Sequence, residues 1–243
     1  MKIRYMALLL ALLAALTLAS CKEEPHTDDP IGGQPPSQDT VPEVFVYQSG
    51  DIGDTGLRWE LRSDDTLYIV GTGAMPEDMI TKAQVGNSEQ PWSAYANTQS
   101  NEDRVAFSRV VVEDGVTGLS QMSFKNCEKL TEVVLGKGIT KIPYDCFTGS
   151  TKLQKVVAKS VTVIDENAFQ GCRALKALTV SASLATVEIG AFSGAATEKG
   201  LTLTLSGTEA EWLAAKETLV LIDPEEVNKP FANAMLAPTF VSK

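Results

Sequence analysis

The chain has 243 residues, with 21 lysines and arginines against 31 aspartates and glutamates, so its formal net charge is −10. This acidic balance repels phosphate backbones and argues against a general nucleic-acid-binding protein. The one histidine, His26, precedes the segment that we expect to fold, which excludes a histidine-dependent catalytic relay or a histidine-rich zinc site in that segment.

The amino-terminal residues have the pattern of an export signal. Lys2 and Arg4 supply positive charge, and the run from Met6 to Leu18 is apolar apart from one threonine. The run is too short to span a bilayer but has the length of the apolar part of a signal peptide. We therefore expect residues 1–20 to be a signal peptide, and no later segment offers the roughly 18 consecutive apolar residues of a membrane helix.

Small residues lead directly to a cysteine at the end of this segment, in the order Leu18-Ala19-Ser20-Cys21. This order resembles the lipobox of bacterial lipoproteins, in which the signal is removed before the cysteine and the cysteine is acylated. The alternative is an ordinary secretory signal followed by a chance cysteine. Several acyl chains together give stable anchoring, so the resemblance implies a membrane partner through a lipid anchor at Cys21.

Residues 21–43 are expected to be a flexible tether. They are rich in proline, glycine and acidic residues, a composition that buries too little apolar area to offset the entropy lost on folding. The acidic residues directly after Cys21 resemble signals that send some Gram-negative lipoproteins to the outer face of the outer membrane. We therefore expect a lipid-anchored outer-membrane protein that faces the cell exterior, with a merely solvated linker as the alternative.

Internal repetition is the strongest structural pattern in the chain. Phenylalanines recur every 22 or 23 residues, with an aliphatic residue five positions before each one. A short β-branched run, such as Val110-Val111-Val112, and a turn signal complete the unit. The phenylalanines are Phe124, Phe147, Phe169 and Phe192, and the aliphatic residues are Leu119, Ile142, Ile164 and Val187. Because one such unit cannot bury its apolar face alone, the units must stack.

The repeat predicts a mainly β fold, a short solenoid whose coils each add one strand to a parallel sheet. We assign residues 108–200 to the coils. Residues 44–107 are expected to form a β-rich N-terminal cap, because alternating apolar residues on both sides of Ser63-Asp64-Asp65 predict a hairpin. Residues 201–243 are expected to form a C-terminal cap that hides the last sheet edge and contains a short helix, which begins at the capping box Thr208-Glu209-Ala210-Glu211.

These units resemble a known family. The segment VVVEDGVTGLSQMSFKNCEKLTEVVLGKGITKIPYDCFTGSTKLQKVVAKSVTVIDENAFQGCRAL is similar to the BspA-like leucine-rich repeats of bacterial surface proteins. The segments LRWELRSDDTLYIVGTGAMPEDM and PWSAY are similar to the β-rich lead-in that precedes such repeats. The resemblance implies a leucine-rich-repeat solenoid that serves adhesion or host interaction at the cell surface.

Three cysteines remain after Cys21. Cys127 and Cys172 occupy the same place in coils two apart, on the order of 10 Å from each other if coils stack at strand spacing. This exceeds the roughly 7 Å limit between the Cα atoms of a disulfide. Cys146 has a different place in its coil, so we expect three buried free thiols that act as small apolar side chains.

No pattern supports catalysis, and we predict that the protein is not an enzyme and has no cofactor or metal. Walker, dinucleotide-binding and calcium-binding motifs are absent from the sequence. Asp165 and Glu166 are a candidate carboxylate pair for a glycosidase, but a solvated turn is the simpler interpretation. Trp92 and Tyr95 are candidates for a carbohydrate-stacking platform, although aromatic residues in a cap are more often core.

The candidate binding site lies on the outer face of the sheet. Strand side chains alternate, so if the first and third residues of each valine run point inward, one residue per coil points outward. This gives an outer column of Val111, Val134, Val157 and Thr179, beside which lie Arg109, Glu132 and Lys155. An apolar column with charged margins suits a protein or glycan partner. The alternative is that β-branched residues simply suit strands.

Two functions therefore remain open. The first is a surface binding module, either an adhesin or a host-interaction protein. The second is a structural or accessory envelope lipoprotein, for example one that takes part in glycan capture.

Overall fold

The computed structural model describes five stretches of the chain, residues 43–76, 90–96, 106–197, 200–226 and 228–243. All of them belong to one compact unit. The expected signal peptide, the lipidation site Cys21 and nearly all of the expected tether lie outside the described residues. Within the described residues no helix is both long and apolar enough to cross a membrane.

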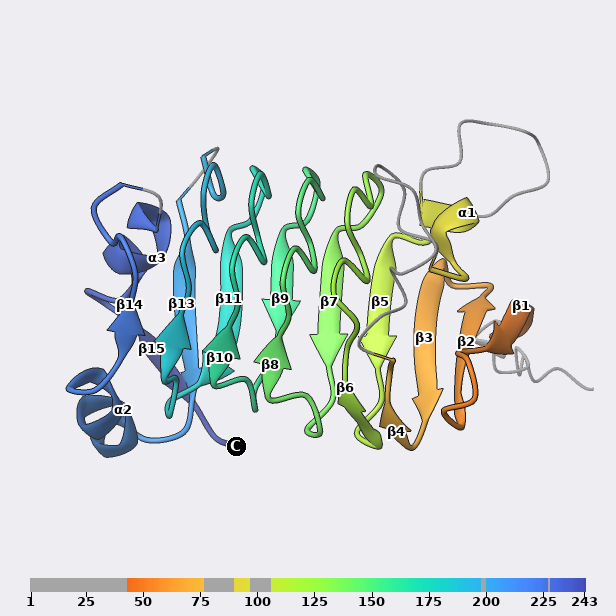
Figure 1. Ribbon diagram of the computed structural model, residues 1–243, viewed down its shortest axis with the longest axis horizontal. Helices are drawn as coiled ribbons and strands as arrows, with labels where there is room; N and C mark the ends of the chain where they lie inside the picture. The colour runs from red at the N-terminus through yellow and green to blue at the C-terminus, as the bar shows by residue number, and fades with distance from the viewer. Residues whose placement is uncertain (1–42, 77–89, 97–105, 198–199, 227) are drawn as a thin grey trace, which may run out of the picture. The chain divides into compact units, whose positions relative to one another are not determined.

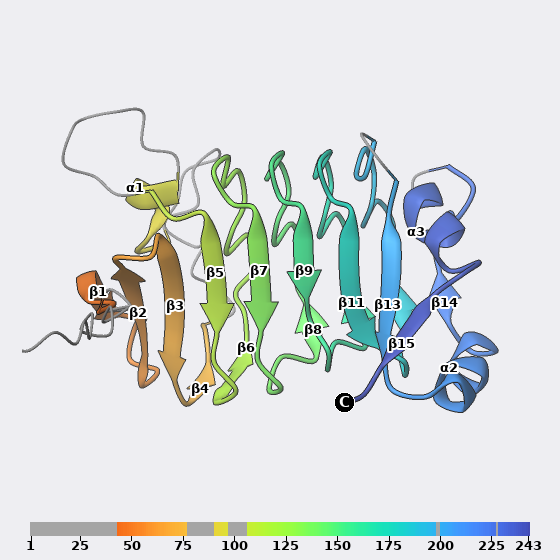
Figure 2. The ribbon, with the colours of Figure 1, turned by 180° about the vertical axis from the view of Figure 1, so that it is seen from behind.

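A nine-stranded sheet forms one side of this unit (Figures 1 and 2), in the order β1-β2-β3-β5-β7-β9-β11-β13-β15. β1 pairs with β2 and β2 with β3 in antiparallel fashion, whereas every later pair is parallel. The strands are β1 Val46–Asp51, β2 Leu57–Arg62, β3 Thr66–Gly71, β5 Arg109–Val112, β7 Glu132–Leu135, β9 Lys155–Val157, β11 Ala177–Ser181, β13 Thr202–Ser206 and β15 Thr239–Val241. The predicted parallel sheet and the predicted hairpin are both confirmed.

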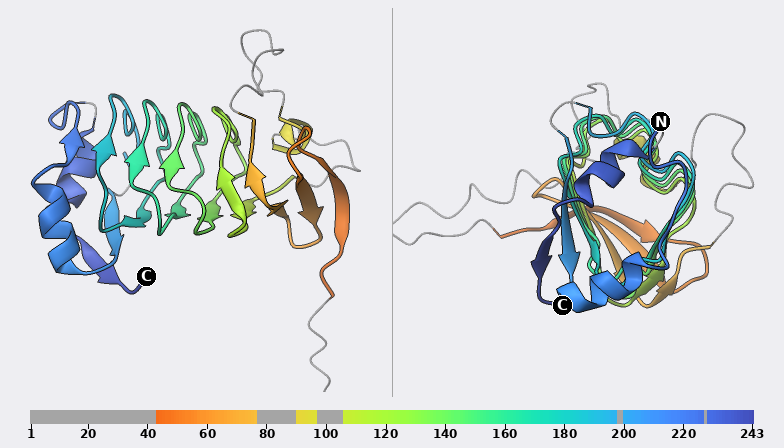
Figure 3. Two further views of the ribbon diagram at one scale, coloured as in Figure 1. Left: turned by 60° about the horizontal axis from the view of Figure 1, so that its bottom comes forward. Right: turned by 90° about the vertical axis from the view of Figure 1, so that its left-hand side faces the viewer.

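Shorter elements complete each coil. A four-stranded parallel sheet on another side contains β8 Lys141–Ile142, β10 Val163–Ile164, β12 Thr186–Val187 and β14 Val220–Leu221. A two-stranded sheet pairs β4 Gly73–Ala74 with β6 Val116–Gly118, and the helices are α1 Ser93–Ala96, α2 Glu209–Lys216 and α3 Lys229–Ala234. Viewed along the solenoid, successive coils nearly superpose (Figure 3), so equivalent residues of neighbouring coils lie one above the other.

A column of stacked aromatic rings fills the interior. The four repeat phenylalanines are fully buried, as predicted, and neighbouring ring centroids lie 5.6, 5.4 and 5.2 Å apart. The column continues at both ends beyond the predicted repeats. Trp92 stacks on Phe124 at 5.7 Å, and Phe231 stacks on Phe192 at 5.0 Å. One ring per coil therefore supplies the core of the whole solenoid with a regular apolar contact.

Backbone hydrogen bonds join each phenylalanine to the following coil. The N–H groups of Phe124, Phe147 and Phe169 donate to the carbonyl oxygens of Cys146, Ala168 and Ala191, at 2.9, 2.9 and 2.8 Å. The N–H of Phe192 finds a side chain instead, because it donates to Oδ1 of Asn228 at 2.9 Å. The last of these repeat units is thus completed by an amide side chain that takes the place of a peptide carbonyl.

The turns around each phenylalanine require left-handed backbone. Residues two positions before and two positions after each ring have positive φ, and they are Met122, Asn126, Asp145, Gly149, Asn167, Gly171, Gly190 and Gly194. Glycine, asparagine and aspartate adopt this conformation at low cost, which explains seven of the eight positions. Nothing in the structure explains the methionine.

The C-terminal region contains the predicted helix. In α2, Thr208 Oγ1 accepts from the Glu211 N–H at 3.1 Å, and Glu211 Oε2 accepts from the Thr208 N–H at 2.8 Å, which is the expected capping box. The region also extends both parallel sheets, through β13, β14 and β15. Among the described strands the nine-stranded sheet ends on β15, whose three residues make a short edge of the kind that limits unwanted strand pairing.

Candidate functional site

The predicted outer column forms as the alternation requires. Val111 pairs with Val134, Val134 with Val157, and Val157 with Thr179 in the strand register, and all four side chains are half-buried. Their neighbours Val110, Val112, Val133, Leu135, Val156 and Ala158 are buried, as expected for inward positions. The sheet thus presents one continuous apolar strip, on the face that Figure 2 turns toward the reader.

The predicted charged margin consists of two ion pairs that share Glu132. Glu132 lies between two cations, with Lys155 Nζ 2.8 Å from one carboxylate oxygen and Arg109 Nε 3.2 Å from the other. The Arg109 contact lacks hydrogen-bond geometry, so it is an ion pair only. The hydrogen bond from Lys155, together with the charges of Lys155 and Arg109, lowers the pKa of Glu132 despite partial burial. These ion pairs are accessible to solvent and contribute little stability, but they fix the side chains beside the valine column.

The outer column extends past the predicted residues at both ends. Tyr68 precedes Val111 in register, and the guanidinium of Arg62 lies 3.8 Å from the centroid of its ring. Thr204 and Thr239 follow Thr179, and their hydroxyl oxygens are 3.0 Å apart. The face therefore runs from an aromatic and charged end, through valines, to a threonine-rich end.

The two candidates from the N-terminal cap lie in or against the core. Trp92 is 1% exposed, and its indole N–H donates to the carbonyl oxygen of Ser123 at 3.0 Å. Tyr95 is partly buried, with its ring centroid 5.8 Å from that of Trp59. Trp92 therefore cannot stack on a sugar, which confirms the interpretation of this residue as core.

The carboxylates Asp165 and Glu166 have different surroundings. Lys141 Nζ lies 2.8 Å from Asp165 Oδ2, whereas Glu166 is exposed at the coil corner. Within the described stretches no group of three or more histidine, cysteine or acidic side chains is placed to hold a metal ion. This arrangement agrees with the interpretation of the corner as a solvated turn.

The three thiols are free and buried, as predicted. Burial raises the pKa of Cys127 to about 12 and raises the pKa of Cys172 as well. Burial also holds the pKa of Cys146 well above its usual range, and the nearby Cys127 and Cys172 add to the effect. Thiols held in the protonated form are poor nucleophiles and poor metal ligands, so these side chains act as core.

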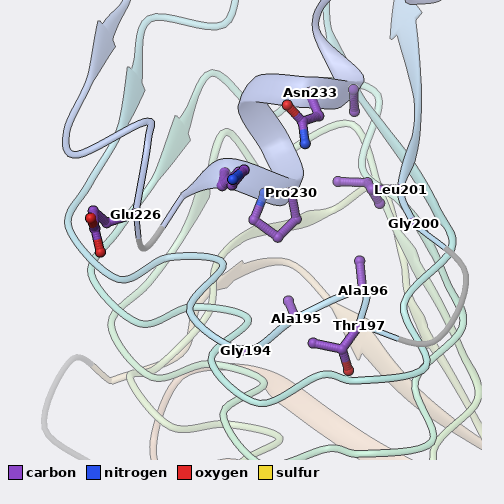
Figure 4. A pocket seen from close by; sticks show the side chains of 11 residues that line it. Gly194, Ala195, Ala196, Thr197, Gly200, Leu201, Glu226, Pro230 and Asn233 are labelled. Atoms are coloured by element: carbon purple, nitrogen blue, oxygen red, sulfur yellow. The ribbon is translucent and has the colours of Figure 1, made fainter.

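An open pocket of about 510 Å³ lies between the coil turn at Gly194 and helix α3 (Figure 4). Most of its lining is glycine, alanine, leucine or proline. The polar side chains of Glu226 and Asn233 lie on different sides of it in Figure 4, and both residues are exposed. Because its polar groups do not converge, this pocket lacks the arrangement that orients a small ligand.

One set of surface cations was not identified from the sequence. Lys129, Lys152, Arg173 and Lys176 are exposed at the coil corner that precedes the nine-stranded sheet. They differ in residue type and in spacing, so no motif connects them along the chain. The stacking of the coils brings them together.

Comparison with known proteins agrees with the fold. Residues 100–209 match the family described as BspA type leucine rich repeat region, in six copies. No curated protein matches the chain.

Two solved structures are similar. A leucine-rich repeat protein from Eubacterium ventriosum is 21% identical, with 67% of this chain and 38% of that chain covered and a TM-score of 0.48. A leucine rich cell surface protein from Faecalibacterium prausnitzii is 19% identical, with 65% of this chain and 45% of that chain covered and a TM-score of 0.37. The present chain thus spans less than half the length of either protein. Residues 100–209 of the chain are thus BspA-type leucine-rich repeats.

Proposed function

We propose that the chain is a lipid-anchored cell-surface binding protein, an adhesin or a host-interaction module, and not an enzyme. The outer face of the nine-stranded sheet would dock a protein or glycan partner. The observation that supports this proposal best is the continuous strip of half-buried side chains at Val111, Val134 and Val157, in register across three strands.

The rigidity of this face favours binding. The strands that carry the three valines, β5, β7 and β9, are paired on both sides, and their inward side chains pack into a buried core. A surface that is already ordered loses little conformational entropy when a partner docks. Apolar side chains at the centre with charged groups at the margin also match the general anatomy of a protein interface.

The location of the protein is part of the proposal. A signal peptide over residues 1–20 would direct export, and acylated Cys21 would hold the chain in the outer membrane, facing the exterior. Residues 21–43 would be the tether, residues 44–107 the N-terminal cap, residues 108–200 the repeats and residues 201–243 the C-terminal cap. The presence of a named cell-surface protein among the similar structures is consistent with this location.

Replacing Cys21 with serine should abolish anchoring. Serine has no thiol to acylate, so the variant should accumulate as uncut precursor or be released in soluble form. Membrane fractionation and metabolic labelling with a fatty acid would measure the change, with Cys127→Ser as the control that leaves the anchor intact. A Cys21→Ser protein that still carried lipid label would contradict the proposed anchor.

Acidic side chains in the outer column should weaken partner binding. The Val134→Glu, Val157→Glu protein is expected to bind its partner about tenfold more weakly, a loss of about 1.4 kcal/mol, because two charges would be buried in the interface. The full chain would first be tested on an array of matrix proteins and glycans, and the variant would then be titrated against the strongest ligand.

The matched control places the same change on the other parallel sheet. Val163 in β10 and Val220 in β14 both point away from the core, on the four-stranded sheet. The Val163→Glu, Val220→Glu protein therefore gains the same charge far from the column. It should bind as the parent protein does. Equal binding by the Val134→Glu, Val157→Glu protein and the parent would place the partner elsewhere.

One edge of the nine-stranded sheet favours a second candidate, an accessory subunit of an envelope assembly. Among the described strands β1 is terminal, and Phe45, Val46 and Tyr47 in and beside it are 45–55% exposed. Exposed apolar edges invite pairing with another chain. An accessory subunit would bind no ligand on the array and would co-purify with a second envelope protein, which distinguishes it from an adhesin.

A further inference from the structure

One corner of the solenoid is cationic. It is the corner where the chain leaves the phenylalanine turn and enters the nine-stranded sheet, and it carries five exposed cations in three consecutive coils. We call these residues the basic ridge, and they are Lys129, Lys152, Lys155, Arg173 and Lys176.

Hydrogen bonds between coils align the ridge. The N–H of Gln154 donates to Thr131 O at 2.9 Å, and the N–H of Lys176 donates to Gln154 O at 3.0 Å. Equivalent positions therefore repeat at strand spacing, about 4.8 Å. Lys129 and Lys152 each stand one residue before the buried leucine of their coil, so they occupy the same position in adjacent coils. The cations of the ridge consequently follow one another along one corner of the solenoid, coil by coil.

Most of the charge on the ridge is not neutralised by neighbouring carboxylates. The ion pairs found among the described residues do not include Lys129, Lys152, Arg173 or Lys176. Lys155 shares Glu132 with Arg109, so that carboxylate already faces two cations. Including Arg109, the corner has six cations against the two carboxylates of Glu128 and Glu132.

Acidic residues outnumber basic ones in the rest of the chain. The corner beyond the four-stranded sheet carries Asp165, Glu166 and Glu188, of which Asp165 is paired with Lys141. The chain as a whole has a formal net charge of −10. A polyanion is therefore repelled by most of the molecule and attracted to one line on it, which would also orient the bound ligand.

We propose that the basic ridge binds an anionic polysaccharide, with carboxylate or sulfate groups against the cations. This inference rests on the proposed binding function and names the chemical class of the partner. Cations in three consecutive coils suit a polymer that carries anionic groups along its length, and the polar side chains of Thr151 and Gln154 lie among the cations to meet sugar hydroxyls.

The ridge lacks the features of a nucleic-acid site. Single-stranded nucleic acids are held by aromatic side chains on which bases stack, in addition to cations. The three coil edges that form the ridge, residues 127–132, 150–155 and 172–177, contain no aromatic residue. An anionic polysaccharide needs only charge and hydrogen bonding, which these edges supply.

Binding should be measured with the full chain in a non-ionic detergent. The probes are heparin as a sulfated polymer, polygalacturonate as a carboxylated polymer, dextran as a neutral one and a single-stranded DNA oligonucleotide. We expect at least one of the charged polysaccharides to bind and to weaken as salt rises from about 50 to about 200 mM, because cations on the ridge displace counterions from the polymer. Dextran should not bind.

Charge-matched variants test the position of the site. Lys129→Gln, Lys152→Gln, Arg173→Gln should weaken polysaccharide binding about tenfold or more, with a shallower salt dependence. The control Lys137→Gln, Lys216→Gln, Lys229→Gln removes the same charge from exposed positions elsewhere and should change binding less than about twofold.

Three results would overturn the inference. They are equal losses in the two triple variants, binding of DNA as tight as that of the polysaccharides, and no binding of either charged polysaccharide at low salt. The outcome also separates this inference from the proposed sheet-face site. Loss of polysaccharide binding in the ridge variant alone, with no array ligand sensitive to Val134→Glu, Val157→Glu, would keep the ridge and reject the sheet face.

Discussion

Replacing Phe147 with alanine should lower the free energy of unfolding by about 3–5 kcal/mol. The ring is fully buried and stacks between Phe124 and Phe169, with centroid distances of 5.6 and 5.4 Å. Its removal leaves a cavity and deprives both neighbours of a contact. In a solenoid, where coils support only their neighbours, a loss at the centre divides the array. Urea denaturation followed by circular dichroism would measure the effect.

Two control variants separate ring stacking from general damage. Phe147→Leu keeps most of the buried volume and should cost less than the alanine variant. Leu213→Ala removes a large apolar side chain that is 56% exposed on α2, and it should change stability by less than about 0.5 kcal/mol. If Phe147→Ala unfolded at the same urea concentration as the parent protein, the ring column would not be the core of the solenoid.

Replacing Asn228 with alanine should lower the free energy of unfolding by about 3 kcal/mol, because it leaves one buried and two part-buried backbone groups without this partner. Asn228 is 0% exposed, and its amide nitrogen donates to the carbonyl oxygens of Glu188 and Ile222 at 2.8 and 2.6 Å. Its Oδ1 accepts from the Phe192 N–H at 2.9 Å. Alanine meets none of these three groups.

Hydrogen exchange provides a local measurement for this variant. The Phe192 amide should lose protection in Asn228→Ala more than the Phe147 amide does, since the latter bonds to the Ala168 backbone. Asn233→Ala, which truncates an exposed asparagine in the helix α3 that Asn228 precedes, should leave both amides and the overall stability unchanged. Unchanged protection of Phe192 in the Asn228 variant would show that the side chain does not complete the last repeat unit.

The repeat core could be predicted from the sequence because burial imposes a strict spacing. Each coil must place one aromatic ring and one inward-facing strand residue at the same point of the solenoid cross-section. The interval from Phe124 to Phe147 therefore equals that from Val110 to Val133. The outer column followed from the same spacing, because strand side chains alternate. Local turn chemistry was equally informative for α2, where the capping box lies within four residues.

The ends of the ring column could not be predicted, because the spacing fails there. Trp92 lies 32 residues before Phe124, and Phe231 lies 39 residues after Phe192, so neither fits the period of 22 or 23. Asn228 left no pattern either, since one amide that satisfies three backbone groups has no periodic signature. The basic ridge was missed because its cations share a surface only after the coils stack.

The direction of the hydrogen bonds from the phenylalanine N–H groups also determines when each of them can form during synthesis. The N–H groups of Phe124, Phe147 and Phe169 each donate to a carbonyl oxygen of the following coil, so each stays unsatisfied until that coil has been synthesised. Of these four N–H groups, that of Phe192 stays unsatisfied longest, because its acceptor belongs to Asn228, 36 residues later. Synthesis must therefore reach Asn228 before that donor is satisfied, and until then the nascent solenoid exposes its open end to other strands nearby.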